Sequence, residues 1–192
     1  MKNKNSEDAK RPYHETIMIR LAAAGDETAF ARIVEHHQGR VRTLFLRWCG
    51  NQAMADDFSQ LAFLQCWQKL KSLQNPLSFS GWLRQIALNI WLQHIRKNDA
   101  LWGAEEYDQQ QASAPDHDIT TPLDLDRALS FLPNNQRTVL VLHYYEQLTH
   151  SEIAAALDMP LGTVKSHLKR GGEQLKNILN DYKMTTQKET AS

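Results

Sequence analysis

The chain has 192 residues, of which 42 % are apolar, so it is long enough to fold around one sizeable core or two small ones. Its 22 basic and 22 acidic residues give a formal net charge of zero. No apolar run approaches the roughly 18 residues of a membrane span, and the polar start MKNKNSEDAKRPYHE lacks the apolar core of a secretion signal. We therefore expect a cytoplasmic protein without direct membrane insertion.

The neutral total hides a segregation of charge along the chain. Residues 1–97 carry 14 basic and 8 acidic groups, net +6, and residues 127–192 carry 8 and 6, net +2. Residues 98–126 between them carry 8 acidic groups and no lysine or arginine, net −8. This acidic segment is also rich in Pro, Ser and Gln, which is typical of a flexible connector between two basic domains.

The first basic block has helical periodicity throughout. The segment HETIMIRLAAA predicts a helix that ends at Gly25, and Asp26 is the expected N-cap of a long second helix that runs to Trp48 and Gly50. A third helix is predicted in NQAMADDFSQLAFLQCWQKL. After the loop KSLQNPLSF, Ser80 is expected to cap a fourth helix, GWLRQIALNIWLQHIRK. Cys49 and Cys66 are predicted to be reduced core thiols, with a redox switch as the alternative.

The second basic block is also predicted to be helical. Asp124 or Asp126 leads the segment LDRALSFL, Pro133 breaks it, and NNQRTVLVLHYYE follows. The β-branched and aromatic residues of this last segment leave a strand open, although its uninterrupted length favours a helix. Thr149 with Glu152 three residues later is a capping-box signature before the apolar run of LTHSEIAAAL.

The segment LDMPLGTVKSHLKRGGEQL completes a helix-turn-helix pattern, in which the second of two short helices is basic. From Pro160 to Asn180 the net charge is +3, and a solvated amphipathic helix is the alternative explanation. The Gly171–Gly172 pair costs roughly 1 kcal/mol per residue against Ala, so the far end is expected to bend or fray. The inward face is predicted to comprise Val164, Leu168, Leu175 and Leu179, and the side chains left free or nearly free are Thr163, Lys165, Ser166, His167, Lys169 and Arg170.

The C-terminal block resembles the fourth conserved region of bacterial sigma factors of the extracytoplasmic-function (ECF) group. The shared features are the leucine-proline start at Leu132, the internal Arg137, the EIA helix and the GTVKS turn. The DNA-binding domains of response regulators and quorum-sensing activators share part of this pattern, and His167 fits them better.

The N-terminal block favours the sigma factor over a stand-alone helix-turn-helix regulator of the response-regulator type. The segment ADDFSQLAFLQCW resembles the second conserved region of the same sigma factors, and GWLRQIALNIWLQHIRK resembles their promoter-opening segment. The resemblance covers about residues 20–97 and 123–179, in the family's order. An enzyme built on Asp56, Asp57, His36 and His37 has no Gly-rich phosphate loop, nucleophile elbow or metal-ligand spacing to support it. A helical adaptor without a nucleic-acid role has equally little support.

The resemblance implies an all-α fold of two small helical domains joined by a flexible acidic linker. Residues 13–97 correspond to the helical bundle of sigma region 2, 98–122 to the linker, 123–180 to the helix-turn-helix of sigma region 4, and 181–192 to a tail. The implied partners are core RNA polymerase, promoter DNA and an anti-sigma factor that holds the protein inactive until a stress signal. No cofactor, metal or catalytic residue is expected.

The resemblance also assigns site residues. Asp57, Gln60 and Leu64 share a helix face that would contact the coiled coil of the largest polymerase subunit. By the same resemblance, Leu73 lies in the loop that would hold a flipped promoter base. The remaining candidates for contact with the minus-ten element are Arg84, Asn89, Gln93, Arg96 and Lys97. Contacts with the minus-thirty-five element are assigned to the second helix of the helix-turn-helix, through Thr163, Lys165, Ser166, His167, Lys169 and Arg170.

Overall fold

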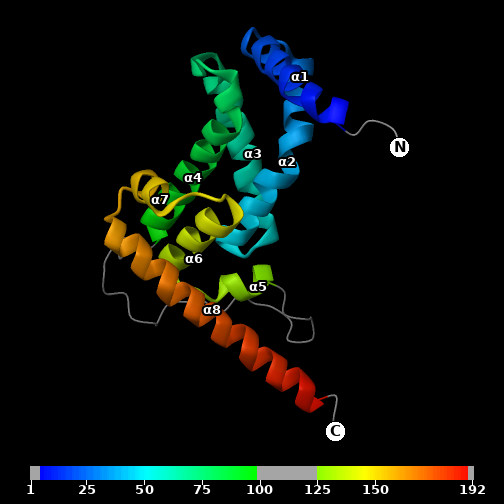
Figure 1. Ribbon diagram of the computed structural model, residues 1–192. Coiled ribbons are helices and arrows are strands. Elements are labelled where there is room, and N and C mark those ends of the chain that lie inside the picture. Colours follow the sequence, from blue (N-terminus) through cyan, green and yellow to red (C-terminus); the bar gives the residue numbers. More distant parts are fainter. Residues whose placement is uncertain (1–4, 99–124, 190–192) are drawn as a thin grey trace.

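The computed structural model describes the backbone of residues 5–98 and 125–189 and the side chains of residues 14–97 and 125–180, and all regular elements in these ranges are helices (Figure 1). The N-terminal bundle comprises α1 (Asn5–Ala23), α2 (Glu27–Cys49), α3 (Gln52–Lys69), the 3-10 turns η1 (Leu70–Ser72) and η2 (Pro76–Ser78), and α4 (Phe79–Asn98). The C-terminal bundle comprises α5 (Leu125–Ser130), α6 (Asn134–Leu140), the π-helix η3 (Val141–Tyr145), α7 (His150–Leu157) and α8 (Leu161–Glu189). The predicted all-α class is confirmed.

Local capping chemistry sets several helix ends where the sequence predicts them. The Asp26 carboxylate accepts a hydrogen bond from the Ala29 N–H at 2.9 Å and so caps α2. Gly50 ends the same helix in the left-handed conformation, with φ +67°. Thr149 and Glu152 form the complete capping box at the start of α7.

Other predicted boundaries are wrong. Ser80 does not cap the fourth helix, because α4 begins one residue earlier, at Phe79, directly after η2. Asp126 lies inside the first turn of α5, and Asp124 lies outside the described residues. The strand considered after Asn134 does not form, since α6 continues into η3. The predicted linker lies outside the described residues except for the backbone of Asn98, while α8 continues through residues 181–189 of the predicted tail.

Large aromatic side chains fill the core of the N-terminal bundle. Trp48 and Trp91 are almost fully buried, and their rings stack with centroids 6.2 Å apart. Burial raises the pKa of the Cys66 thiol to about 12, and burial also raises the pKa of Cys49. Burial thus favours the protonated thiol at both positions, although only Cys66 is a core residue and Cys49 is half-buried.

The two bundles pack directly against each other, a contact that the sequence did not predict. Helices α5 and α6 both pack on α2, and Figure 1 shows α6 below α4 with α5 near the end of α2. The Trp91 indole N–H donates to the Thr138 hydroxyl at 2.8 Å within this buried contact. The Arg47 guanidinium lies 4.0 Å from the centroid of the Tyr145 ring and forms an ion pair of 2.7 Å with Asp126. Polar and aromatic contacts thus join the bundles into one body.

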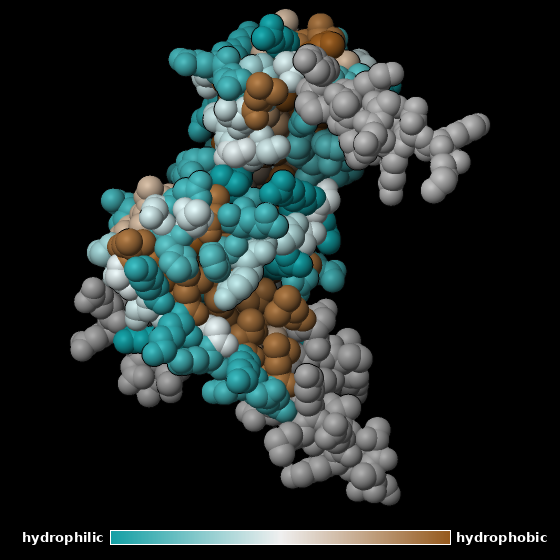
Figure 2. All heavy atoms as spheres, in the orientation of Figure 1, coloured by the Kyte–Doolittle hydropathy of each residue, from teal (hydrophilic) through white to brown (hydrophobic). Residues whose placement is uncertain are grey.

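The surface on the face shown in Figure 2 is largely hydrophilic. Brown atoms gather beside α5 and the middle of α8. Leu125, the first residue of α5, is 51 % exposed. Among the described helices, none is both long enough and apolar enough to cross a lipid bilayer.

Candidate nucleic-acid interface

Helices α7 and α8 form the predicted helix-turn-helix. Asp158 ends α7 in the left-handed conformation, with φ +54°, so the chain turns sharply before α8 starts at Leu161. Ile153, Leu157 and Val164 are buried together in the core. This apolar junction fixes α8 against α7, as a recognition helix requires.

The exposed side of α8 is basic. Lys165, Lys169 and Arg170 are exposed, and Ser166 is half-buried. The prediction that Thr163 and His167 are free is wrong, since they are only 7 % and 5 % exposed. The inward face of α8 is rotated from the predicted one. Gly171 packs on Leu140 and Gln136 of α6, and Val164 and His167 are buried, whereas Leu168, Leu175 and Leu179 are only half-buried.

Gly171 marks a close approach of α8 to α6 and not a frayed end. The α8 helix continues unbroken through the Gly-Gly pair. A Cβ at residue 171 would lie 2.9 Å from Leu140 Cδ1 and 3.2 Å from Gln136 Cβ, whereas a Cβ at residue 172 would meet nothing within 4 Å. A side chain at residue 171 would therefore require Leu140 and Gln136 of α6 to shift.

These neighbouring glycines provide a matched pair for measurement. Gly172→Ala is expected to stabilise the fold by about 0.5–1 kcal/mol, because alanine is the better helix former. Gly171→Ala gains the same propensity but overpacks the α6 contact, which typically costs about 1–3 kcal/mol, so it is expected to be the less stable variant. Urea unfolding of both variants tests this prediction. Equal stabilities would show that Leu140 and Gln136 of α6 accommodate the added methyl group at no cost in stability.

His167 is a polar side chain in an apolar setting. Neither ring nitrogen has a hydrogen-bond partner among the described residues. Burial, and secondarily the nearby Arg170 charge, lower the pKa of His167 below its usual 6.5. The neutral imidazole is thus the form that fits the contact between α8 and α6.

This lowered pKa gives the stability a defined pH dependence. Above about pH 6.5, the ordinary pKa of histidine, His167 is neutral in both the folded and unfolded chain. As the pH falls below that value, the unfolded chain takes up a proton that the folded chain resists, so the free energy of unfolding decreases. Burial lowers the pKa values of His37 and His94 as well, so they act in the same direction. His167→Leu is expected to lose less stability than the parent between pH 7.5 and pH 5.5 in urea unfolding, and an equal loss would contradict this role of His167.

The predicted polymerase-binding residues share one exposed face of α3. Asp57 and Gln60 are exposed, and Leu64 is 53 % exposed. The neighbouring Asp56 is instead paired with Arg42, whose hydrogen bond lowers the pKa of that carboxyl. The face therefore combines an acid, an amide and an uncovered apolar side chain, which suits contact with another protein.

The predicted minus-ten residues divide into two groups. Asn89, Gln93, Arg96 and Lys97 are exposed on α4, and the Gln85 amide donates to the Asn89 side-chain oxygen at 3.1 Å. This polar stripe is accessible for contact with DNA. Leu73, by contrast, is half-buried at the end of η1, and Arg84 turns toward the C-terminal bundle.

Glu146 binds Arg84 and so turns it toward the C-terminal bundle. The sequence did not indicate Glu146 as a functional residue. Its carboxylate is 2 % exposed and accepts hydrogen bonds from Arg40 at 2.9 Å and Arg84 at 3.4 Å. The partners lie 106 and 62 residues away, so no local pattern could have indicated these pairs.

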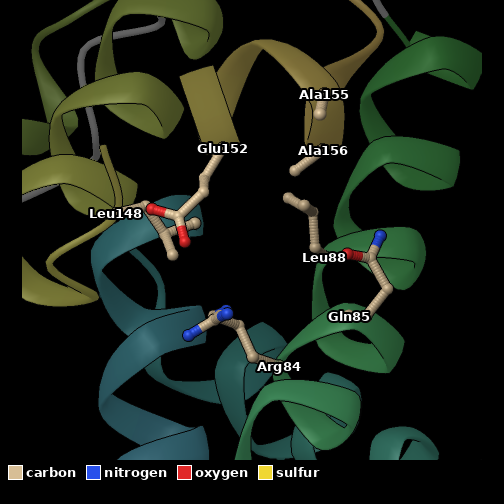
Figure 3. Close-up of a pocket in the computed structure, with 7 residues that line it drawn as sticks. All are labelled: Arg84, Gln85, Leu88, Leu148, Glu152, Ala155 and Ala156. Carbon is tan, nitrogen blue, oxygen red and sulfur yellow. The ribbon is translucent and has the colours of Figure 1, made fainter. Parts of the chain in front are cut away.

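A cavity of about 430 Å³ opens beside this ion pair, between α4 and α7. Figure 3 shows Arg84 and Glu152 extending toward the cavity from opposite sides, with Leu88 and Ala156 on another wall. The Glu152 carboxylate is already bound by the Thr149 N–H at 2.8 Å, and hydrogen bonds from Thr149 lower its pKa. The cavity belongs to the contact between the bundles and holds no further charged group among its lining residues.

Family comparisons match both halves of the chain. The family model described as Sigma-70 region 2 matches residues 33–101, and the one described as Sigma-70, region 4 matches residues 123–175. These two regions on one chain define an RNA polymerase sigma factor and decide against the stand-alone regulator.

Curated relatives place the chain more narrowly. It is 35 % identical over 177 residues to the ECF RNA polymerase sigma factor SigE of Mycolicibacterium smegmatis, which covers 85 % of this chain and 68 % of the relative. It is also 33 % identical over 178 residues to the ECF RNA polymerase sigma factor SigW of Bacillus subtilis. That alignment covers 85 % of this chain and 95 % of the relative. The chain belongs to the ECF RNA polymerase sigma factors.

Solved structures share the fold at lower sequence identity. CnrH, in complex with the cytosolic domain of CnrY, is 21 % identical with a TM-score of 0.55, covering 88 % of this chain and 98 % of that chain. The sigma factor RpoE from Bartonella quintana, in complex with the anti-sigma factor NepR, is 21 % identical with a TM-score of 0.58. The match covers 79 % of this chain and 96 % of that chain.

Proposed function

We propose that this ECF sigma factor acts in the cytoplasm, binds core RNA polymerase, directs it to specific promoters and helps to open the DNA. It contributes recognition and has no catalytic chemistry of its own. An anti-sigma factor holds it inactive until a stress signal; the complex of the similarly folded RpoE with NepR supports this kind of partner.

The observation that carries this proposal is that three separate recognition faces are exposed on one chain. The α3 face of Asp57, Gln60 and Leu64 contacts polymerase. The α4 stripe of Asn89, Gln93, Arg96 and Lys97 contacts the minus-ten element. The α8 face of Lys165, Ser166, Lys169 and Arg170 contacts the minus-thirty-five element.

Each face has side chains suited to its role. Asn and Gln side chains read base edges through paired hydrogen bonds, whereas Arg96 and Lys97 neutralise phosphates without selecting a sequence. Leu73 offers an aliphatic wall beside a flipped base, which excludes water but stacks less strongly than an aromatic ring. Thr163 and His167 position α8 from within the core and do not touch DNA in this proposal.

The direct test adds the purified chain to core RNA polymerase and measures run-off transcription from a library of promoter fragments. Sequence-specific transcripts that depend on the added chain are expected. Binding to core polymerase without any promoter-specific transcription would overturn the proposal, as would a failure to bind core polymerase.

Arg170→Ala is expected to weaken binding to the upstream promoter element by roughly 5- to 150-fold, because a bidentate base contact contributes about 1–3 kcal/mol. Lys176→Ala is the matched control, since Lys176 is an exposed cation further along the same helix and should cost less. Gel-shift titrations of the holoenzyme measure both variants. Binding to core polymerase should survive in each, and its loss in a folded Arg170→Ala protein would contradict the assignment.

A further inference from the structure

Three potential metal ligands meet between α1 and α2. The Glu15 carboxylate and the His37 Nε2 atom lie 2.7 Å apart, although they are 22 residues apart in the sequence. His36 completes the group, and one ligand atom from each of the three residues lies within 4.8 Å of the others. No metal was expected from the sequence, in which Glu15 is 22 residues away from His37.

The helix packing holds this group in place. Gly25, with φ +105°, turns the chain between α1 and α2, and Glu15 and His37 lie at similar distances on either side of it. Ile19 and Ile33, one turn closer to Gly25, are both buried. The Phe79 ring packs on His37 with centroids 5.1 Å apart. His37 is therefore fixed from two sides, and Glu15 is brought to it by the packing of α1.

The group is nevertheless open to solvent. His37 is buried, but His36 is exposed and the Glu15 side chain is 35 % exposed. An ion can enter from this side and keep water in its remaining coordination positions. Arg40 lies one turn beyond His37, but its charge is neutralised by Glu146 at 2.9 Å, which reduces its repulsion of a cation.

We propose that Glu15, His36 and His37 bind one divalent transition-metal ion of the Zn²⁺ type. Two imidazole nitrogens and one carboxylate oxygen are ligands that zinc accepts, and a water molecule can supply the fourth position. Ligand atoms around tetrahedral zinc lie about 3.3 Å apart, given zinc–nitrogen distances of about 2.0–2.1 Å. Rotation of the exposed His36 side chain closes the remaining gap.

The consequence is a cross-link between α1 and α2. Helix α1 also packs on η1 and η2, the turns on either side of the loop assigned to the minus-ten element. Metal binding therefore stabilises α1 against that loop. This inference does not depend on the proposed partners, and its test requires neither polymerase nor DNA.

The experiment uses the full chain without a polyhistidine tag, stripped with a chelator and titrated with Zn²⁺ against a fluorescent zinc indicator. We expect one zinc ion per chain and a higher Tm in the presence of zinc. His36→Ala and Glu15→Gln are each expected to lower the affinity by at least about tenfold, the loss that removal of even a supporting residue can cause. His14→Ala is the matched control, because His14 is exposed on α1 next to Glu15 but outside the group.

Two results would overturn the proposal. One is the absence of a saturable zinc site in the parent chain. The other is an equal loss of affinity in His14→Ala and His36→Ala, which would show that zinc binds surface histidines without selection. His36 is exposed, so its variant is expected to fold, and circular dichroism verifies this before each titration.

Discussion

Replacing Gly50 by alanine is expected to lower the free energy of unfolding by about 2–5 kcal/mol, the sum of about 1–2 kcal/mol of left-handed backbone strain and about 1–3 kcal/mol of overpacking. Gly50 has φ +67°, a conformation that non-glycine residues adopt at a cost. A Cβ at this position would also lie 2.7 Å from the Cβ of Ser130 on α5. Because Gly50 ends α2 and Ser130 ends α5, the new methyl group would push the two bundles apart. Urea unfolding measures the loss, and small-angle scattering is expected to show a larger radius of gyration.

Measuring Gly50→Ala in a second variant, Ser130→Gly, separates the cost of backbone strain from the cost of the contact with Ser130. In a Ser130→Gly chain the nearest atom is removed, so Gly50→Ala should retain only the strain of about 1–2 kcal/mol. The double-mutant cycle gives the coupling between the two positions. An unchanged cost of Gly50→Ala in this background would mean that Ser130 does not limit the approach of α2 to α5.

The elements that the sequence predicted well are those set by local chemistry. Asp26, Gly50 and the Thr149–Glu152 box each act within a few residues of themselves, so their types and spacing are sufficient to place helix ends. The shared exposed face of Asp57, Gln60 and Leu64 follows similarly from their helical spacing, whereas Asn89 was assigned by the resemblance alone. The family resemblance then assigned roles to faces that periodicity alone could only call exposed.

The wrong sequence-based predictions concern residues whose burial and partners are set by tertiary packing. Thr163 and His167 were expected to be free because polar residues usually face water, yet both are buried, His167 one turn before the Gly171 contact with α6. Gly171 was read as a weak helix position, when its missing side chain is what allows α6 to approach. Glu146 and the Glu15–His37 pair depend on residues distant in sequence, and periodicity carries no information on such pairs.

The contact between the bundles constrains how a promoter can be bound. Trp91 on α4 bonds to Thr138 on α6, and α6 packs on α8 at Gly171, so α4 and α8 are separated by two helix contacts of about 8–10 Å each. The names of the two proposed promoter elements, minus ten and minus thirty-five, imply a separation of about 25 base pairs, roughly 85 Å along straight DNA at 3.4 Å per pair. We therefore expect the bundles to separate when both elements are bound at once.

Glu146→Gln is the change expected to favour that separation most directly. The substitution keeps the size of the side chain but removes the charge that holds Arg40 and Arg84, and hydrogen bonds to charged groups contribute about 1.5–3 kcal/mol. The arginine side chains are 52 % and 28 % exposed, so water can rehydrate them after the bundles part. Urea unfolding should show the loss of stability, and scattering should show an expanded chain. Arg84 is also released for contact with phosphate.

Asp126→Asn is the matched control for this variant. Asp126 also pairs with an arginine across the bundle contact, at 2.7 Å from Arg47, but its side chain is 32 % exposed, against 2 % for Glu146. The half-buried Arg47–Asp126 pair is closer to the solvent-accessible pairs that contribute about 0.2–1 kcal/mol, so this variant should lose less stability and stay compact. Equal effects of the two substitutions would mean that burial of Glu146 adds nothing to the contact. Expansion of the Glu146→Gln chain alone would identify this carboxylate as the group that keeps α4 and α8 too close for simultaneous promoter contacts.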